Sequence, residues 1–296
     1  DCNTRQGCPL DQIISHINGR RMAFCCLPHP HADHYLGLHE ILKSARAKEP
    51  PVQFWHTLSE LDKIHDTLFT ALVHPAADGA TAEEKDLHYL ADLFRWIAKT
   101  PNIAPEAIRQ IAMRTFAGVE VYLIAPPTDV WNSYATYLLR HRELKKPVGA
   151  NAANSISLAL LIRYGGVGIW LLGDLSAGAQ LDIPSRLCSN MPNGGPEVRS
   201  RVLKVAHHGA KNSWNSQIPA ALMVCDEQDL VVISADGVRH PNKDVLDGWI
   251  DTRKRVLGTW MSAPPQTAPP TNWDDGALEH AMPQLTSRPF RNVRIE

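Results

Sequence analysis

The sequence predicts an α/β protein, because short apolar runs of strand length alternate along the chain with longer amphipathic segments of helical period. Of the 296 residues, 44% are hydrophobic and 21% are charged, which is typical of a globular protein with a sizeable core. The longest apolar runs, around 156–162 and 167–172, have the length of strands. None approaches the ~18 apolar residues of a membrane span, so we expect a soluble protein with no membrane segment.

Charge and cysteine content narrow the class of protein further. A formal net charge of −1 excludes a chain that holds nucleic acid by bulk positive charge, although a local basic groove remains compatible with it. The six cysteines show no C-x-x-C pair and no regular spacing, which argues against a zinc ribbon or a dense disulfide framework. Together with first residues that lack a signal-peptide pattern, this favours a cytoplasmic location.

The first part of the chain predicts a strand, a polar loop and a helix in succession. Residues 20–27 are an apolar run that indicates a buried strand, and residues 36–47 repeat apolar side chains at helical spacing. Residues 82–98 carry a second amphipathic helix, and residues 105–113 predict a short helix with proline near its start. We therefore expect a helical insertion over about 56–115.

The second part predicts a series of strands that end in polar loops. After about residue 263 the chain is rich in Pro and Thr and indicates an extended tail, so we expect one domain over 1–262 and a tail over 263–296. The predicted strands are 119–124, 156–163, 167–172, 202–206 and 230–234, and the predicted helices are 130–142 and 243–257.

The loop after the first predicted strand gathers four potential metal ligands within six residues, namely His29, His31, Asp33 and His34. Imidazole nitrogens and carboxylate oxygens are donors that zinc, manganese and iron accept. In an irregular loop, His29 and His31 can point to one metal while Asp33 and His34 turn to a second. The alternative is a polar surface turn, but so dense a cluster with an aspartate inside it favours metal binding.

The pattern His29-x-His31-x-Asp33-His34 resembles the signature of the metallo-β-lactamase superfamily of metallohydrolases. The next landmark of that superfamily is a strand that ends in Gly-Asp, and 169–174 supplies such a strand with Asp174 at its end. Alone, Gly-Asp after an apolar run would indicate a turn. The resemblance implies that Asp174 bridges two metals, and that the fold is a four-layer αββα sandwich with the metals at one edge of two packed sheets.

A His-His-Gly segment follows the strand predicted at 202–206. It resembles one branch of the superfamily, the hydrolase domain associated with bacterial competence DNA-uptake proteins, whose relatives include phosphorylcholine esterases. The resemblance implies that one imidazole completes the metal ligands and that the other lies beside them. We assign His208 as the ligand and His207 as the catalytic group, and the reverse assignment stays open.

The stretch 151–158 is similar to the Asn/Ser-rich strand entry of the same branch. The wider superfamily places a histidine ligand near this point, and this chain has none there. The resemblance therefore implies that one metal has fewer protein ligands and is more open to water or substrate.

The segment 234–241 is similar to the closing Ser-x-Gly…His-Pro element of the branch. Within it, His240 is a candidate general acid, phosphate contact or metal ligand. The alternative is that His240 caps the helix that begins near Pro241.

The resemblance implies a hydrolase that uses two divalent metal ions, zinc or alternatively manganese, to activate water. Asp33 would orient that water, and His207 or His240 would offer a proton to the leaving group. The branch favours a phosphodiesterase or nuclease with a phosphodiester or nucleic-acid substrate. The alternatives are a small-molecule ester, lactone or phosphorylcholine hydrolase, or a metal-binding regulatory subunit that acts with a protein partner.

Overall fold

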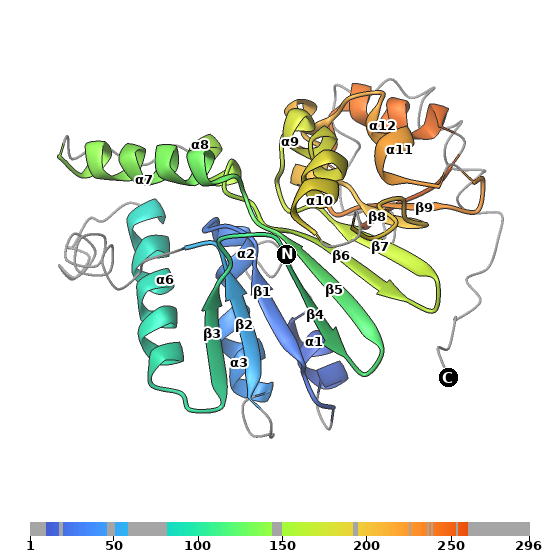
Figure 1. Cartoon of the computed structure of the whole chain (residues 1–296). Coiled ribbons are helices and arrows are strands. Elements are labelled where there is room, and N and C mark those ends of the chain that lie inside the picture. Colours follow the sequence, from blue (N-terminus) through green and yellow to red (C-terminus); the bar gives the residue numbers. More distant parts are fainter. Residues whose placement is uncertain are drawn as a thin grey trace.

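Two β-sheets form the centre of the molecule (Figure 1). The computed structural model describes residues 10–17, 20–45, 51–58, 82–143, 150–191, 195–224, 226–235, 237, 239–252 and 254–259. The first sheet is parallel throughout, in the order β1-β2-β3. Its strands are β1 (Phe24–Leu27), β2 (Val52–His56) and β3 (Ile103–Ala107).

The second sheet is mixed and has the order β10-β9-β8-β7-β6-β5-β4. Neighbouring strands from β4 to β7 are antiparallel, and those from β7 to β10 are parallel. Its strands are β4 (Ala112–Phe116), β5 (Val119–Ile124), β6 (Ala159–Tyr164), β7 (Val167–Leu171), β8 (Val202–Lys204), β9 (Leu230–Ile233) and β10 (Arg255–Gly258).

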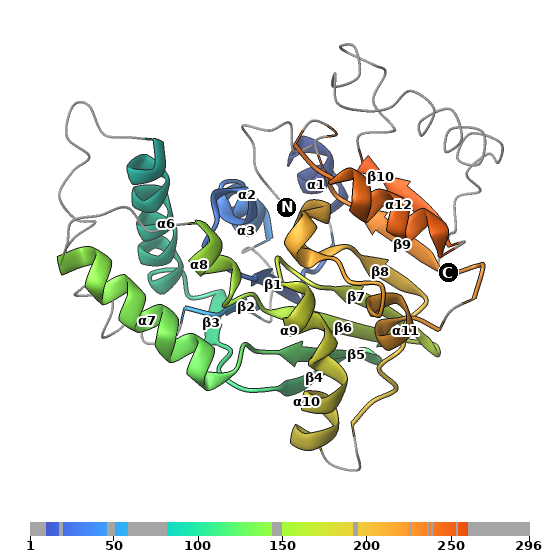
Figure 2. The same ribbon diagram turned by 90° about the horizontal axis from the view of Figure 1, so that it is seen from above.

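Helices flank both sheets (Figures 1 and 2). The helices form two groups. Helices α1, α2, α3 and α6 pack with the first sheet, and α9 to α12 pack with the second. The helices are α1 (Leu10–Ile17), α2 (Ala32–Tyr35), α3 (Leu38–Ala45), α6 (Ala82–Ala98), α7 (Thr128–Glu143), α8 (Ala150–Asn154), α9 (Ala177–Leu181), α10 (Ile183–Asn190), α11 (Ile218–Leu222) and α12 (Lys243–Asp251).

Both faces of the first sheet carry buried apolar side chains. Successive side chains of a strand point to opposite sides of the sheet, so neighbouring residues of β2 enter different clusters. Phe54 of β2 belongs to a buried cluster with side chains of α3 and α6, such as Leu42 and Ile97. Its neighbour Trp55 belongs to a different buried cluster, together with Leu123 of β5 and other side chains of the second sheet. The two sheets therefore pack against each other through the face that Trp55 occupies.

The opposite face of the second sheet packs against the second group of helices. Trp170 of β7 and Leu203 of β8 are fully buried in one cluster with Leu187 of α10 and Trp249 of α12. Helices α9, α10, α11 and α12 thus bury their apolar sides on this sheet, and the core consists of three main apolar zones, one on each side of the pair of sheets and one between them.

The topology brings several polar loops to one edge of the second sheet. Strands β7, β8 and β9 are parallel neighbours, so their carboxyl ends lie at the same edge. The antiparallel β6 begins at that edge, since Leu160 pairs with Leu171. Residues just before β6 and just after β7, β8 and β9 are therefore close in space.

One predicted helix is wrong and a second is wrong in part. Residues 105–113 were expected to be helical, but Ile103–Ala107 is strand β3 and Ala112–Phe116 is strand β4. Pairing of Val52 with Ile103 onward outweighs the local helical pattern, and Pro105 is tolerated because β3 is an edge strand. The helix expected over 243–257 ends at Asp251, because Arg255–Gly258 pairs with β9 as strand β10.

Most other predicted elements are confirmed with small shifts of their ends. The mixed α/β class is confirmed, strand β5 has the predicted bounds, and α6 is the helix expected at 82–98. Residues 59–81 of the expected insertion and the expected tail 263–296 lie outside the described residues. In the described part, no helix combines the length and the apolar character that crossing a membrane requires.

The imidazole of His56 gives the fold a testable pH dependence. Burial lowers the pKa of His56 from 6.5 to about 4, against a weaker opposing effect of a backbone hydrogen bond at Leu58. Its ring packs edge-on against Phe94 at a centroid distance of 5.1 Å. Because the unfolded chain binds a proton at higher pH than the folded one, stability falls as the pH drops from about 6.5 toward 4.

We expect the free energy of unfolding of the metal-free protein to fall by about 2 kcal/mol more between pH 7 and pH 5 than that of His56→Gln, which cannot titrate. Urea unfolding of both proteins at the two pH values measures the difference. Equal pH dependence in the two proteins would contradict the buried neutral state of His56.

Candidate metal centre

The loop after β1 turns twice and places its four polar side chains in two directions. The His31 N–H donates to the His29 carbonyl at 3.0 Å, and the His34 N–H donates to the His31 carbonyl at 3.0 Å. These bonds turn the chain from strand into the short helix α2, which carries Asp33 and His34. His29 is fully buried and His34 nearly so.

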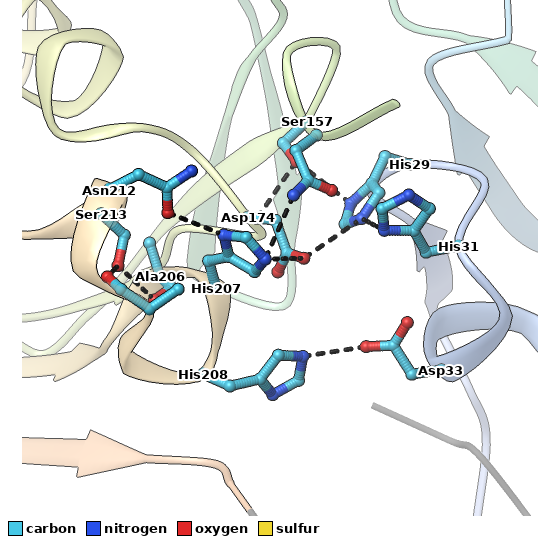
Figure 3. A network of polar contacts seen from close by, with 12 residues as sticks. His29, His31, Asp33, Ser157, Asp174, Ala206, His207, His208, Asn212 and Ser213 are labelled. Carbon is cyan, nitrogen blue, oxygen red and sulfur yellow. Dashed lines mark hydrogen bonds and ion pairs between the residues drawn. The ribbon is translucent and has the colours of Figure 1, made fainter. Parts of the chain in front are cut away.

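The structure brings the predicted residues together as two groups of three, which Figure 3 shows in part. Within each group, three ligand atoms lie within 4.8 Å of one another, as the ligands of one metal ion require. The first group, His29, His31 and Asp174, is the more buried. The second group is Asp33, His34 and His208.

Asp174 follows β7, belongs to the first group and also faces His34 of the second group. Its Oδ2 atom is 3.4 Å from His29 Nε2, and its Oδ1 atom is 3.5 Å from His34 Nε2. The side chain is only 2% exposed. Burial alone would raise the pKa of Asp174, but the contacts with His29 and His34 outweigh it and hold the pKa well below its usual range.

The turn Ala206–Gly209 after β8 delivers the two consecutive histidines. Both have left-handed backbone angles, with φ of 48° at His207 and 54° at His208. This conformation is uncommon for residues other than glycine. The His207 N–H donates to the Gly173 carbonyl at 3.0 Å, which attaches the turn to the loop of Asp174.

His208 belongs to the second group. Its Nε2 atom is 2.9 Å from Asp33 Oδ2, and its Nδ1 atom is 2.6 Å from the Ser234 carbonyl. A carbonyl only accepts hydrogen bonds, so Nδ1 carries a proton and donates. The neighbouring Asp33 carboxylate outweighs burial and raises the pKa of His208, while His208 and His34 outweigh burial and lower the pKa of Asp33.

His207 lies outside both groups, although its Nε2 atom is 3.9 Å from Asp174 Oδ2. Two amides hold its ring: Nδ1 is 3.1 Å from Asn212 Oδ1 (Figure 3), and Nε2 is 3.2 Å from Asn154 Nδ2. An amide oxygen only accepts, so Nδ1 carries a proton and donates it to Asn212. The Nε2 side of the ring is thereby directed at Asp174.

His240 faces the same two histidines without joining either group. Its ring centroid lies 5.8 Å from that of His207 and 6.3 Å from that of His208. The alternative in which His240 caps the following helix is wrong. The N-cap of α12 is Asn242, whose side chain accepts from the Asp244 N–H at 3.1 Å.

The electrostatics of the site suit a divalent cation. Burial, with a smaller effect of His34, lowers the pKa of His29 to about 3 against the opposing effect of Asp174. The imidazole is therefore neutral at pH 7, which is the form of histidine that binds a metal. The buried Asp174 Oδ1 atom accepts no hydrogen bond from the described residues. Two carboxylates and four imidazoles form a donor set that zinc and manganese accept. The residues present therefore fit a metal.

Four partners of the site were not assigned in the sequence: Ser157, Asn154, Asn212 and the Ser234 carbonyl. Ser157 and Asn154 lie in the Asn/Ser-rich stretch before β6, which was noted only as a resemblance. The density of small polar residues there was a signal, but contacts with His29 and His207 depend on how the sheet edge assembles.

No family profile and no curated protein sequence matches the chain. Several solved structures are similar to it, and two of them are the following. One is the metallo-β-lactamase fold protein YhfI from Bacillus subtilis, with a TM-score of 0.45 and 10% identity, covering 84% of this chain and 79% of that one. The other is unliganded yeast PDE1, with a TM-score of 0.37 and 11% identity, covering 85% of this chain and 60% of that one.

Gly209 closes the histidine turn in a place that has no room for a side chain. Its φ is +80°, and an added Cβ would lie 2.7 Å from Pro241 Cβ. We expect Gly209→Ala to lower the free energy of unfolding by about 1–3 kcal/mol more than Gly165→Ala does. Gly165 is the matched control, because it also has a positive φ, +56°, but an added Cβ there meets nothing within 4 Å. Chemical denaturation measures both, and equal losses would contradict the close packing at Pro241.

Proposed function

We propose that this chain is a metal-dependent hydrolase of the metallo-β-lactamase superfamily, and that it cleaves phosphodiester bonds. One observation carries the proposal: two groups of three ligand atoms lie side by side, with the two oxygens of Asp174 facing His29 and His34. The order of the motifs along the chain and the His-His-Gly turn support the branch associated with competence DNA-uptake proteins. We take the hydrolase domain as residues 1–262.

The packing of the sheets supports a four-layer αββα sandwich for this domain. Helices α1, α3 and α6 lie on one sheet, the sheets share the apolar zone around Trp55, and α9 to α12 lie on the second sheet. The candidate residues follow β1, β7 and β8, at an edge where both sheets end. Fold alone does not fix the substrate, so the activity is argued from the site.

Two divalent ions, zinc or manganese, would be held by the two groups, with Asp174 as the shared carboxylate. Bound ions of this kind supply an activated water at neutral pH and stabilise the charge that grows on the attacked centre. The carboxylate of Asp33 would orient the attacking water. The outward-facing second group would meet the substrate first, since Asp33 and His208 retain 22% and 19% side-chain exposure.

His207 and His240 would serve the leaving group, because both rings stand beside the ligand groups without belonging to them. Asn154 and Asn212 hold the His207 ring and set its direction. A positioned imidazole can donate a proton or a hydrogen bond to a departing oxygen.

Cationic side chains near these loops bear on the phosphodiester proposal. Burial lowers the pKa of Lys204 at the end of β8, although Asp174 and Asp33 oppose the effect. Lys211 is exposed and forms an ion pair with Asp244 at 3.2 Å, and Arg239 is exposed. The exposed Lys211 and Arg239 suit a phosphate, which is the argument for a phosphodiester over a neutral lactone or ester.

We expect two transition-metal ions per chain, because the donors form two groups. Elemental analysis of protein prepared without chelator, and again after reconstitution with Zn²⁺ or Mn²⁺, measures the stoichiometry. A panel of linear DNA, RNA, cyclic dinucleotides and bis-p-nitrophenyl phosphate, with a phosphorylcholine ester and a lactone beside them, identifies the substrate class from the products. Absence of bound metal after reconstitution would exclude the hydrolase, and metal without turnover would favour a regulatory subunit.

We expect Asp174→Ala to abolish turnover and to loosen both metals, because this carboxylate faces both groups. Asp174→Asn keeps the shape but loses the charge, so it should mainly lower metal affinity and water activation. The exposed Asp251→Asn is the control and should match the wild type. Metal content and turnover are measured on all three variants. Wild-type values in Asp174→Ala would refute the hypothesis that the two metal groups share the Asp174 carboxylate.

Alanine variants of the two consecutive histidines should lose different properties. His208→Ala should lower metal occupancy, and excess metal should restore part of the activity. His207→Ala should keep its metal and reduce kcat by about 10²–10⁴-fold, as loss of a positioned proton donor does. Metal stoichiometry and kcat for both variants test the assignment. The opposite pattern would exchange the roles, and metal retained in both would point to His240 as the ligand.

A further inference from the structure

Ser157 lies where β6 begins, at the edge where β7 ends, and its side chain is fully buried. Neither ligand group includes it. Gly173 stands opposite, with a φ of +54°, and an added Cβ there would lie 3.2 Å from Ser157 Cβ. The glycine therefore lets the chain before β6 come close to the loop that carries Asp174.

The Ser157 hydroxyl touches two members of the first group (Figure 3). The backbone N–H of Asp174 donates to Ser157 Oγ at 3.1 Å, and Oγ is 3.0 Å from Nδ1 of His29. Asp174 and His29 come from loops on different sheets. A single hydroxyl thus connects the two loops behind the ligand atoms.

The direction of the bond to His29 follows from which nitrogen faces the other ligands. His29 Nε2 is 3.1 Å from His31 Nδ1 and 3.4 Å from Asp174 Oδ2, so Nε2 is the atom that the group offers to a metal. A neutral imidazole that binds through Nε2 carries its proton on Nδ1. A serine oxygen has two lone pairs, so it can accept this Nδ1–H as well as the Asp174 N–H.

We propose that Ser157 is a positioning residue of the first metal group, whose oxygen accepts both the His29 Nδ1–H and the Asp174 N–H. It fixes the tautomer and ring orientation of one ligand and the backbone of the other. The next residue adds to this, because the Leu158 N–H donates to the Pro28 carbonyl at 2.9 Å, immediately before His29. The inference rests on the proposed function, since it takes the first group as a metal site.

Zinc titration against a chromophoric chelator tests the role without an activity assay. In Ser157→Ala, the affinity for one of the two ions should fall by about 10–100-fold, the usual effect of removing a partner behind a metal-bound histidine. Ser155→Ala is the matched control: its side chain is exposed and bonds only to the Ala152 carbonyl at 2.7 Å among the contacts of the described residues. The control should stay within about twofold of the wild type. Wild-type affinity for both ions in Ser157→Ala would overturn the proposal.

A second pair of variants separates the hydroxyl from the packing. Ser157→Thr and Ser157→Val have nearly the same shape and differ in one hydroxyl, so a comparison of the two measures the effect of the hydroxyl at nearly equal packing. The threonine variant should bind zinc more tightly than the valine variant by about 10-fold or more. Equal affinities in the two variants would overturn the role of the hydroxyl.

The tautomer of His29 is readable in the zinc-loaded wild-type protein. Long-range ¹H–¹⁵N correlation spectra should show the proton of His29 on Nδ1, and a His29 ring with no proton on Nδ1 would overturn the proposal. Zinc binding also keeps the two hypotheses apart. A wild-type protein that binds no zinc refutes the proposed function, whereas wild-type zinc affinity in Ser157→Ala refutes only the role of Ser157.

Discussion

The contacts of the Asp174 carboxylate with His29 and His34 join the two sheets at the site. A buried carboxylate is unfavourable unless donors surround it, because it has lost its hydration. The histidines that surround Asp174 belong to the loop after β1, in the first sheet, whereas Asp174 follows β7 in the second. The polar contacts across this edge therefore depend on the apolar packing between the sheets, which brings the two loops within reach of each other.

The histidine turn shows how the backbone separates two adjacent side chains. Left-handed angles at two successive non-glycine residues are unfavourable by about 1–3 kcal/mol each. The surrounding bonds stabilise them: Asn212 holds the ring of His207, and the Ser234 carbonyl holds that of His208. As a result, one ring turns toward Asp174 and the other toward Asp33.

Local pattern predicted the parts of this molecule that depend on neighbours in sequence. The loop after β1 is one such part, since its four candidate ligands lie within six residues and their alternation already indicated two directions. The strand at Ile103–Ala107 was missed because its partner β2 lies far earlier in the chain. Pairing with β2 outweighed the local helical pattern. Ser157 was missed for a related reason, because a serine before a strand has no particular role until the fold places it behind His29.

The wide separation of the ligands along the chain has a consequence for synthesis on the ribosome. The bond between Asp33 and His208 joins positions 175 residues apart. The loop with four donors is therefore made long before the last donors that complete its groups. Contacts between such distant segments form late in folding, because closing a long loop costs entropy before the contact is gained. The two groups of three side chains are consequently complete only in chains that have already formed β8 and joined it to the second sheet, and a truncated chain ending before β8 would carry the histidine loop without His208.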